Sequence, residues 1–153
     1  TTRTTNKDWG LPAPVSFADG YPILVTNTAS LSAVNDYIIA HGSDSLSMDR
    51  FRPNIVIESD TPWAEDDWGV LQIGDVILDL VKPCARCVMT SIDQATGAIH
   101  PKTALNALRA LHPSSDPRNP GVLFGWNAVP RPLQNGTANI HVGQNVAILP
   151  QQT

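Results

Sequence analysis

Several residue types that mark particular classes of protein are scarce in this chain of 153 residues. Charged residues make up only 16% of it, and the formal net charge is −4, so there is no basic excess. A general nucleic-acid-binding protein would show a positively charged face, and we therefore expect no nucleic-acid partner. No apolar run approaches the roughly 18 residues that a transmembrane helix needs, so we expect no membrane span.

Cysteine is also scarce, since the chain has only Cys84 and Cys87. A disulfide between residues three apart would close no useful loop, which favours free thiols and a cytoplasmic location. A structural zinc ion needs about four ligands. The two cysteines supply two, and no two of the four histidines have a ligand-like spacing. We therefore expect no zinc.

The remaining composition is that of a folded domain, with 42% hydrophobic residues. The length fits one domain, which we place at residues 16–153 after a loose entry segment at residues 1–15. Thirteen prolines and ten glycines favour many short strands over long helices. The predicted fold is therefore mainly β, a barrel with a few short peripheral helices.

Short β-branched or alternating runs predict strands, and apolar residues at helical spacing predict two helices. Strands are expected at residues 21–26, 52–57, 70–73, 76–81, 88–92, 98–100, 122–127, 138–142 and 146–149, and helices at residues 28–42, capped by Thr28 or Ser30 and ended by Gly42, and 102–111. A tight turn would join strands 70–73 and 76–81. The last two strands would form a closing hairpin.

The stretch from Lys82 to Cys87 holds both thiols and two cations, and it lies between two runs that are predicted to be strands. A thiol becomes a nucleophile or a soft-metal ligand only as thiolate, which nearby Lys or Arg favours. A thioredoxin-type pair would stand at the start of a helix, which the following β-branched run does not predict. The alternative is that both cysteines are small buried apolar residues.

Other polar and aromatic positions predict structure more than chemistry. We interpret Trp63 and Trp68 as packing residues, and Glu65 and Asp66 as a solvated turn. The histidines are expected on the surface or in turns, and no catalytic triad is apparent. The pair at 124–125 predicts a core strand with a close backbone approach at the glycine.

Four stretches, taken in order, resemble the MOSC domain, which is named for the C-terminal part of molybdenum cofactor sulfurases. The resemblance is greatest to the bacterial YcbX-type proteins and the mitochondrial amidoxime-reducing components. The four stretches are Phe17-Ala-Asp-Gly-Tyr-Pro22 with Ala29-Ser-Leu31, Phe51-Arg-Pro-Asn-Ile-Val56, Cys84-Ala-Arg-Cys87 with Thr90 and Asp93, and Phe124-Gly125 with Gly136 and Val142-Gly143.

The resemblance implies a β-barrel that binds molybdenum cofactor, with Cys87 as the molybdenum ligand and catalytic residue. The implied cofactor-binding residues are Arg52, Asn54, Asp19, Gly20, Tyr21, Ala85, Arg86 and Lys82. Arg52 would bind phosphate through its forked, permanently charged donors, and Asn54 would bind along the pterin edge. Alternatively, Arg52 forms a surface ion pair and Asn54 satisfies a strand end. Ala85 stands where some relatives carry serine.

The activity that the resemblance implies is reductive removal of oxygen from small N-hydroxylated compounds, independent of pyridoxal phosphate. Electrons would come from a separate reductase or ferredoxin-like protein. One alternative is a sulfur carrier in which Cys87 forms a persulfide and Cys84 acts as the resolving thiol. Another is a non-catalytic module that needs a partner. We expect the chain to be the C-terminal part of a longer protein or to share its site with a partner.

Overall fold

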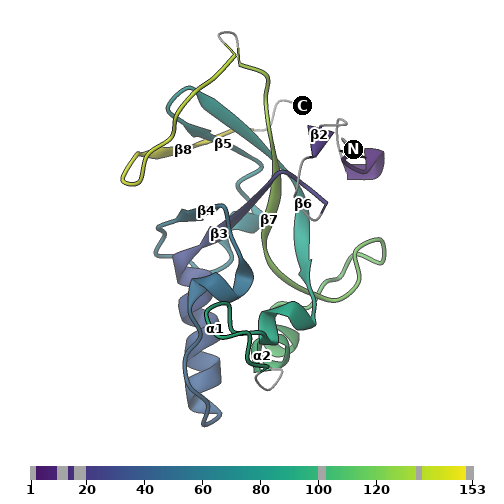
Figure 1. The fold of residues 1–153 in the computed structure, drawn as a ribbon, viewed down its shortest axis with the longest axis vertical. Helices are drawn as coiled ribbons and strands as arrows, with labels where there is room; N and C mark the ends of the chain where they lie inside the picture. Colours follow the sequence, from purple (N-terminus) through teal and green to yellow (C-terminus); the bar gives the residue numbers. More distant parts are fainter. Residues whose placement is uncertain (1–2, 10–13, 16–19, 100–102, 134–135, 151–153) are drawn as a thin grey trace.

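The computed structural model describes residues 3–9, 14–15, 20–99, 103–133 and 136–150. The described part is mainly β, as predicted, and one six-stranded sheet in the order β4-β3-β7-β6-β5-β8 curls into a half-barrel (Figure 1). Its strands are β3 Ile23–Asn27, β4 Ile55–Ile57, β5 Val70–Ile73, β6 Val76–Arg86, β7 Val122–Pro130 and β8 Val146–Leu149. The helices α1 Thr28–Ala40 and α2 Thr103–Leu111 pack together below the sheet (Figure 1).

Neighbouring strands of this sheet are antiparallel except β3 and β4. α1 lies between these two strands in the sequence, which gives the long crossover that a parallel pair requires. β5 and β6 form the predicted hairpin. A separate ribbon near the N-terminus pairs β1 Arg3–Thr4 with β2 Pro14–Val15, and the 3-10 turn η1 Lys7–Trp9 lies between them. The boundary at residue 15 stays a prediction.

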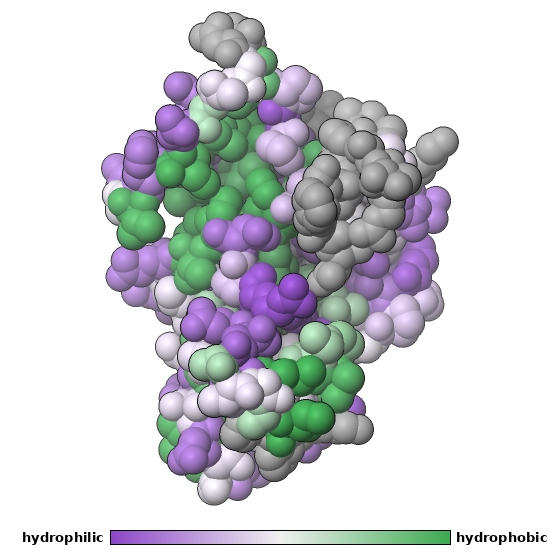
Figure 2. Space-filling model, viewed as in Figure 1, coloured by the Kyte–Doolittle hydropathy of each residue, from purple (hydrophilic) through white to green (hydrophobic). Residues whose placement is uncertain are grey.

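Two apolar clusters form the core. The first lies on the sheet and comprises Val25, Ile57, Trp68, Leu71, Ile73, Leu78, Leu80 and Ala128. The second joins the helices to β7 and comprises Val34, Ile38, Phe51, Ala104, Ala107, Leu108, Val122 and Phe124. Figure 2 shows apolar side chains gathered over the upper, sheet-bearing half of one face, with hydrophilic side chains crossing the middle.

The N-cap of the first helix is Asn27, one residue before Thr28 and three residues before Ser30, the two predicted caps. The side chain of Asn27 is the N-cap, because its Oδ1 accepts the Ala29 N–H at 2.8 Å. Thr28 and Ser30 lie inside the helix instead. The predicted end is confirmed, since Gly42 follows the C-cap and has φ +78°, a left-handed conformation that glycine adopts freely.

Two predicted strands are wrong. Residues 88–91 form the 3-10 turn η4, Val88–Ser91, in which local hydrogen bonds override the β-branched preference. No strand is assigned at residues 138–142, where His141 and Gln144 form a turn. β8 therefore pairs with β5 rather than with the segment before it. At residues 98–100 a single bridge joins Ile99 to Ile92, and His100 lies outside the described residues.

The predicted close approach at Gly125 is confirmed. This residue has φ +75°, and a Cβ built there would lie 2.6 Å from the Val25 carbonyl oxygen and 2.8 Å from a Thr26 methyl carbon. β3 and β7 can therefore pack at this point only because residue 125 has no side chain. Among the described residues, no helix is long and apolar enough to cross a bilayer.

Candidate functional site

The cysteine motif lies at the end of the longest strand. β6 continues through Pro83 and includes Cys84, with register shifts on either side of this proline, where a residue without an N–H is tolerated. Cys87 is exposed and comes directly after the strand, whereas Cys84 is half-buried. The Cys87 carbonyl accepts bonds from the Thr90 N–H at 3.2 Å and its hydroxyl at 3.0 Å. The chain direction after the exposed thiol is thereby fixed.

Arg86 joins this motif to the Arg-Pro-Asn stretch, 35 residues away in the sequence. Its Nη2 donates to the Phe51 carbonyl at 2.7 Å, and its Nη1 donates to the Cys84 Sγ at 3.1 Å. The guanidinium also lies 5.6 Å from the centre of the Phe51 ring. The fold therefore brings together two of the segments that the sequence predicts to form one site.

Arg52 and Asn54 are exposed residues in the turn that enters β4. Arg52 caps the 3-10 turn η2 Met48–Phe51 with φ 55° and ψ 49°, and its N–H donates to the Asp49 carbonyl at 3.0 Å. Asn54 Oδ1 accepts the Leu24 N–H at 2.7 Å, and the Asn54 N–H donates to the Leu24 carbonyl at 2.9 Å. The amide oxygen of Asn54 thus satisfies the edge of β3, and its Nδ2 group is the donor available to a ligand.

Lys82 is half-buried under the N-terminal segment. Its Nζ lies 5.3 Å from the centre of the Trp9 ring, and the Arg118 guanidinium lies 4.6 Å from the same ring. These are cation–π distances, so Trp9 joins η1 to β6 and to the loop before β7. Ala85 is exposed and adds no polar group.

The remaining predicted residues precede β3 in the sequence. Asp19 lies outside the described residues, and Gly20 is exposed. The Tyr21 hydroxyl is buried, with no hydrogen-bond partner among the described residues. Burial and the negative charge of Asp8 raise the pKa of this hydroxyl. No described contact joins Tyr21 to the cysteine motif.

Sequence reasoning missed a polar cluster between the 3-10 turn η3 Ala64–Asp66 and β7. Asp66 accepts the Trp126 indole N–H at 2.8 Å and contacts His112 Nε2 at 2.8 Å. His112 also stacks on Trp63 with 4.3 Å between ring centres. Asp66 is therefore not a merely solvated turn residue, and His112 is not simply a surface histidine.

Electrostatics in this cluster favour the charged forms of both partners. Burial lowers the pKa of His112, but its contacts with Asp66 outweigh burial and raise the pKa overall. Burial raises the pKa of Asp66, but hydrogen bonds from His112 and Trp126 outweigh it and lower the pKa overall. Both side chains are therefore charged at pH values between the lowered pKa of Asp66 and the raised pKa of His112.

Glu65 is the second residue that the sequence analysis misplaced. It is 1% exposed, so the interpretation of it as part of a solvated turn is wrong. Its carboxylate accepts from Asn27 Nδ2 at 2.8 Å and from the Ser30 hydroxyl at 2.8 Å. The Ser30 oxygen in turn accepts the Trp63 N–H at 2.9 Å. Glu65 thus fastens η3 to the start of α1.

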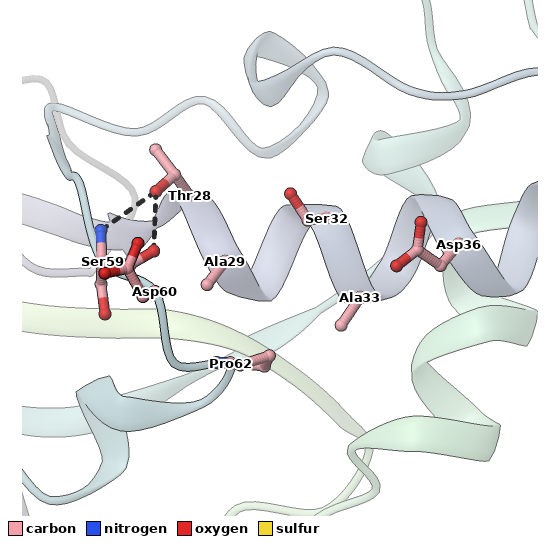
Figure 3. A pocket seen from close by; sticks show the side chains of 8 residues that line it. All are labelled: Thr28, Ala29, Ser32, Ala33, Asp36, Ser59, Asp60 and Pro62. Atoms are coloured by element: carbon pink, nitrogen blue, oxygen red, sulfur yellow. Dashed lines mark hydrogen bonds between the residues drawn. The ribbon is translucent and has the colours of Figure 1, made fainter.

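A cavity of about 300 Å³ lies along the first half of α1 (Figure 3). Hydrogen bonds between the Thr28 hydroxyl and the Ser59 backbone close one end of it, and its acidic groups are Asp36 and Asp60. None of the residues predicted for the cysteine-centred site lines this cavity. Among the described residues, no group of three or more His, Cys, Asp or Glu side chains is arranged to hold a metal ion.

The sequence comparisons place the chain in a family. The family model of the MOSC domain matches residues 12–147, almost the whole chain. The chain belongs to the MOSC domain family. The described half-barrel, with two helices at its lower end, therefore represents a MOSC-type fold.

Curated relatives of this MOSC domain are amidoxime-reducing components. Over 96 residues, 63% of the chain, it is 36% identical to mitochondrial amidoxime-reducing component 1 of Homo sapiens and 38% identical to that of Mus musculus. Over 132 residues, 86% of the chain, it is 29% identical to the Danio rerio protein of that name. These matches cover 27%, 27% and 38% of the relatives' lengths. The names place the relatives in mitochondria, and the cytoplasmic location predicted for this chain stays a prediction.

Proposed function

We propose that this MOSC domain binds molybdenum cofactor through Cys87 and takes part in the reductive removal of oxygen from N-hydroxylated compounds. The observation that carries the proposal is the hydrogen bond from Arg86 to the Phe51 carbonyl. This bond joins the strand that ends at the exposed thiol to the turn that carries Arg52 and Asn54. The names of the curated relatives support the reaction class.

The residues present fit such a group chemically. Cys87 offers an exposed soft sulfur donor, which suits a molybdenum centre. The exposed Arg52 offers a charged, forked donor for phosphate, and Asn54 Nδ2 offers a neutral donor for a pterin edge. The other two predicted cations contact the chain itself, Lys82 at Trp9 and Arg86 at Phe51 and Cys84.

When bound, the cofactor would supply the oxygen-transfer and electron-transfer chemistry, and the chain would bind and orient it. In this proposal the end of β6 fixes the position of the Cys87 sulfur, and the bonds from Thr90 to the Cys87 carbonyl hold the backbone behind it. Asn54 holds the ligand side of the turn by its bonds to β3. A reductase or ferredoxin-like protein would supply the electrons, and the substrate would be a small N-hydroxylated molecule.

Elemental analysis of the chain purified from cells that synthesise molybdenum cofactor tests this function. We expect about one molybdenum per chain, as a single cysteine-ligated centre implies. A chain without molybdenum, even when the adjoining region of a longer gene product is supplied, would contradict the proposal. Reduction of benzamidoxime by the metal-containing protein with a chemical electron donor then tests the reaction class.

The second candidate function is sulfur transfer, which the exposure of Cys87 close to Cys84 favours. The Cys87 thiolate would attack the outer sulfur of a cysteine desulfurase persulfide, and the desulfurase cysteine would leave as its thiolate. Cys87 would then hold a persulfide, which Cys84 could resolve. Mass spectrometry after incubation with a desulfurase and cysteine distinguishes the two functions. A one-sulfur adduct on Cys87 in the metal-free Cys84→Ser variant, in which no second thiol can resolve the persulfide, supports the carrier, and its absence there excludes that function.

A further inference from the structure

The guanidinium of the half-buried Arg86 makes two hydrogen bonds to other parts of the chain. One terminal nitrogen donates to the Phe51 carbonyl at 2.7 Å, and the other donates to the Cys84 sulfur at 3.1 Å. The Nε atom is buried, without a hydrogen-bond partner among the described residues. Each bond uses one of the five N–H groups of the guanidinium, and together they fix the plane of the group against a carbonyl and a sulfur of the chain itself.

The contact to Phe51 acts on the backbone at a strained point. Arg52 adopts φ 55° and ψ 49°, a left-handed conformation that few non-glycine residues adopt. Relaxation of Arg52 to a right-handed or extended φ would rotate the peptide that precedes it, and this peptide contains the Phe51 carbonyl. The bond from Arg86 to this carbonyl therefore resists the rotation that would release the turn.

The Phe51 ring also holds this part of the turn, through its packing in the core. It is fully buried and stacks on Phe124 with 3.8 Å between ring centres. The Arg86 guanidinium carbon lies over the Phe51 ring, 5.6 Å from its centre. The side chain of Phe51 is thus held by packing, while its carbonyl is held by Arg86. Arg52 and Asn54, which follow it, are exposed.

We propose that Arg86 is a positioning residue and not a cofactor ligand: it holds the left-handed Arg52 turn against the cysteine strand, so that Arg52, Asn54 and Cys87 face one site. The role at the cofactor rests on the function proposed above. The role in holding the turn does not, and it can be measured in the chain without cofactor.

Amide hydrogen exchange in the cofactor-free chain tests the role. The Arg52 and Asn54 amides are bonded to the Asp49 and Leu24 carbonyls, so they report opening of the turn. In Arg86→Met we expect these two amides to exchange about tenfold faster, the effect of losing a charge-assisted hydrogen bond, while amides of α2 keep their protection. In Arg86→Lys, one ammonium replaces two fork arms, so we expect an intermediate rate.

Arg118→Met is the matched control, since it removes an exposed guanidinium whose contacts are with Asp116 and Trp9. It should leave exchange at residues 52 and 54 unchanged. Unchanged exchange in Arg86→Met would overturn the proposal.

If Arg86→Met also loses protection in α2, the guanidinium of the unmodified chain is examined by NMR. Separate, slowly exchanging Nη–H signals of Arg86 support the bidentate contact, and a single rapidly averaged signal overturns it.

The molybdenum content of the same variants separates a positioning role from direct ligation. If Arg86 positions the turn, metal retention falls in step with faster exchange, so Arg86→Lys retains more metal than Arg86→Met. A variant with unchanged exchange at residues 52 and 54 but no metal would mean direct ligation and would overturn the proposal. Absence of molybdenum from the unmodified chain would contradict the proposed function, while the exchange result for Arg86 would still stand.

Discussion

At the residue scale, the ion pair of Asp66 and His112 makes stability depend on pH. The pKa of His112 is raised in the folded state, so its contribution is complete below its unfolded pKa of about 6.5 and is lost as pH rises through the folded value. The pKa of Asp66 is lowered, so its contribution is complete above about pH 4 and is lost as pH falls through the folded value. The pair therefore stabilises the fold fully between about pH 4 and pH 6.5.

Asp66→Asn should lower the free energy of unfolding by about 1 kcal/mol in that window, a value that allows for solvent screening of a half-exposed carboxylate. The difference from the unmodified chain should shrink above the window, as His112 becomes neutral. Urea unfolding at pH 5.5 and pH 8.5 measures both values. Asp67→Asn, which removes the neighbouring exposed acid, is the control. A loss that is equal at both pH values would contradict the ion-pair account.

Among the acidic residues, Glu65 is the one whose removal should lower the free energy of unfolding the most. Glu65→Ala leaves Asn27 Nδ2 and the Ser30 hydroxyl with one hydrogen-bond acceptor fewer in a buried place. We expect a loss of about 3 kcal/mol in unfolding free energy, since buried polar groups are costly to leave unpaired. Glu58→Ala, at an exposed position, should change it by less than about 0.5 kcal/mol. Denaturant unfolding of both variants checks this, and equal losses would contradict it.

The sequence could predict the role of a residue that depends on its neighbours in the sequence, but not the role of a residue whose contacts are distant in the sequence. The close approach at Gly125 follows from a glycine inside an apolar strand, whereas the sequence left open whether the cysteines are buried. The buried state of Glu65 depends on Ser30, 35 residues earlier, and the cluster at Asp66 depends on His112, 46 residues later. No local pattern distinguishes these acids from solvated ones.

At the element scale, the antiparallel pairing of β3 with β7 depends on a residue without a side chain, Gly125. Gly125→Ala would place a Cβ 2.6 Å from the Val25 carbonyl oxygen, in backbone that cannot move aside easily. We expect a loss of about 3 kcal/mol, of which the left-handed φ accounts for about 1 kcal/mol and overpacking for the rest. Denaturant unfolding measures the total.

Gly42→Ala separates the two contributions to that loss. Gly42 has φ +78°, but a Cβ there would meet nothing within 4 Å. Its loss should therefore be only about 1 kcal/mol, the cost of the left-handed conformation alone. If the two variants lost equal stability, strain and not the close approach would explain Gly125.

Element types were predictable where one pattern dominated the segment. The hairpin of β5 and β6 follows from the apolar runs on either side of a turn, and α1 follows from helical spacing. The segment 88–91 has β-branched residues but forms η4, because the Thr90 hydroxyl and N–H both bond to the Cys87 carbonyl. Residues 138–142 alternate as a strand would and were expected to pair with residues 146–149. Residues 146–149 form β8, which pairs with β5 instead. Pairing partners are chosen by the whole sheet, which a local pattern does not contain.

At the scale of the whole molecule, the half-barrel places the end of β6 and the turn before β4 next to one another through β3 and β7. The composition predicted a mainly β fold, and the order of four short stretches indicated the MOSC family, which the family model confirms. The strand order could not be derived from the sequence, because it depends on long-range pairing. The cofactor and the reaction stay proposals, since the chain matches only 27–38% of the named relatives' lengths.

The most direct test of the central claim is the molybdenum content of Cys87→Ser and Cys84→Ser, purified side by side with the unmodified chain from cofactor-producing cells. Serine preserves size at each position but removes the soft sulfur donor. We predict that Cys87→Ser retains almost no molybdenum, while Cys84→Ser retains most of it, because the Cys84 sulfur accepts a bond from Arg86 within the chain. Full retention of molybdenum by Cys87→Ser would contradict the account.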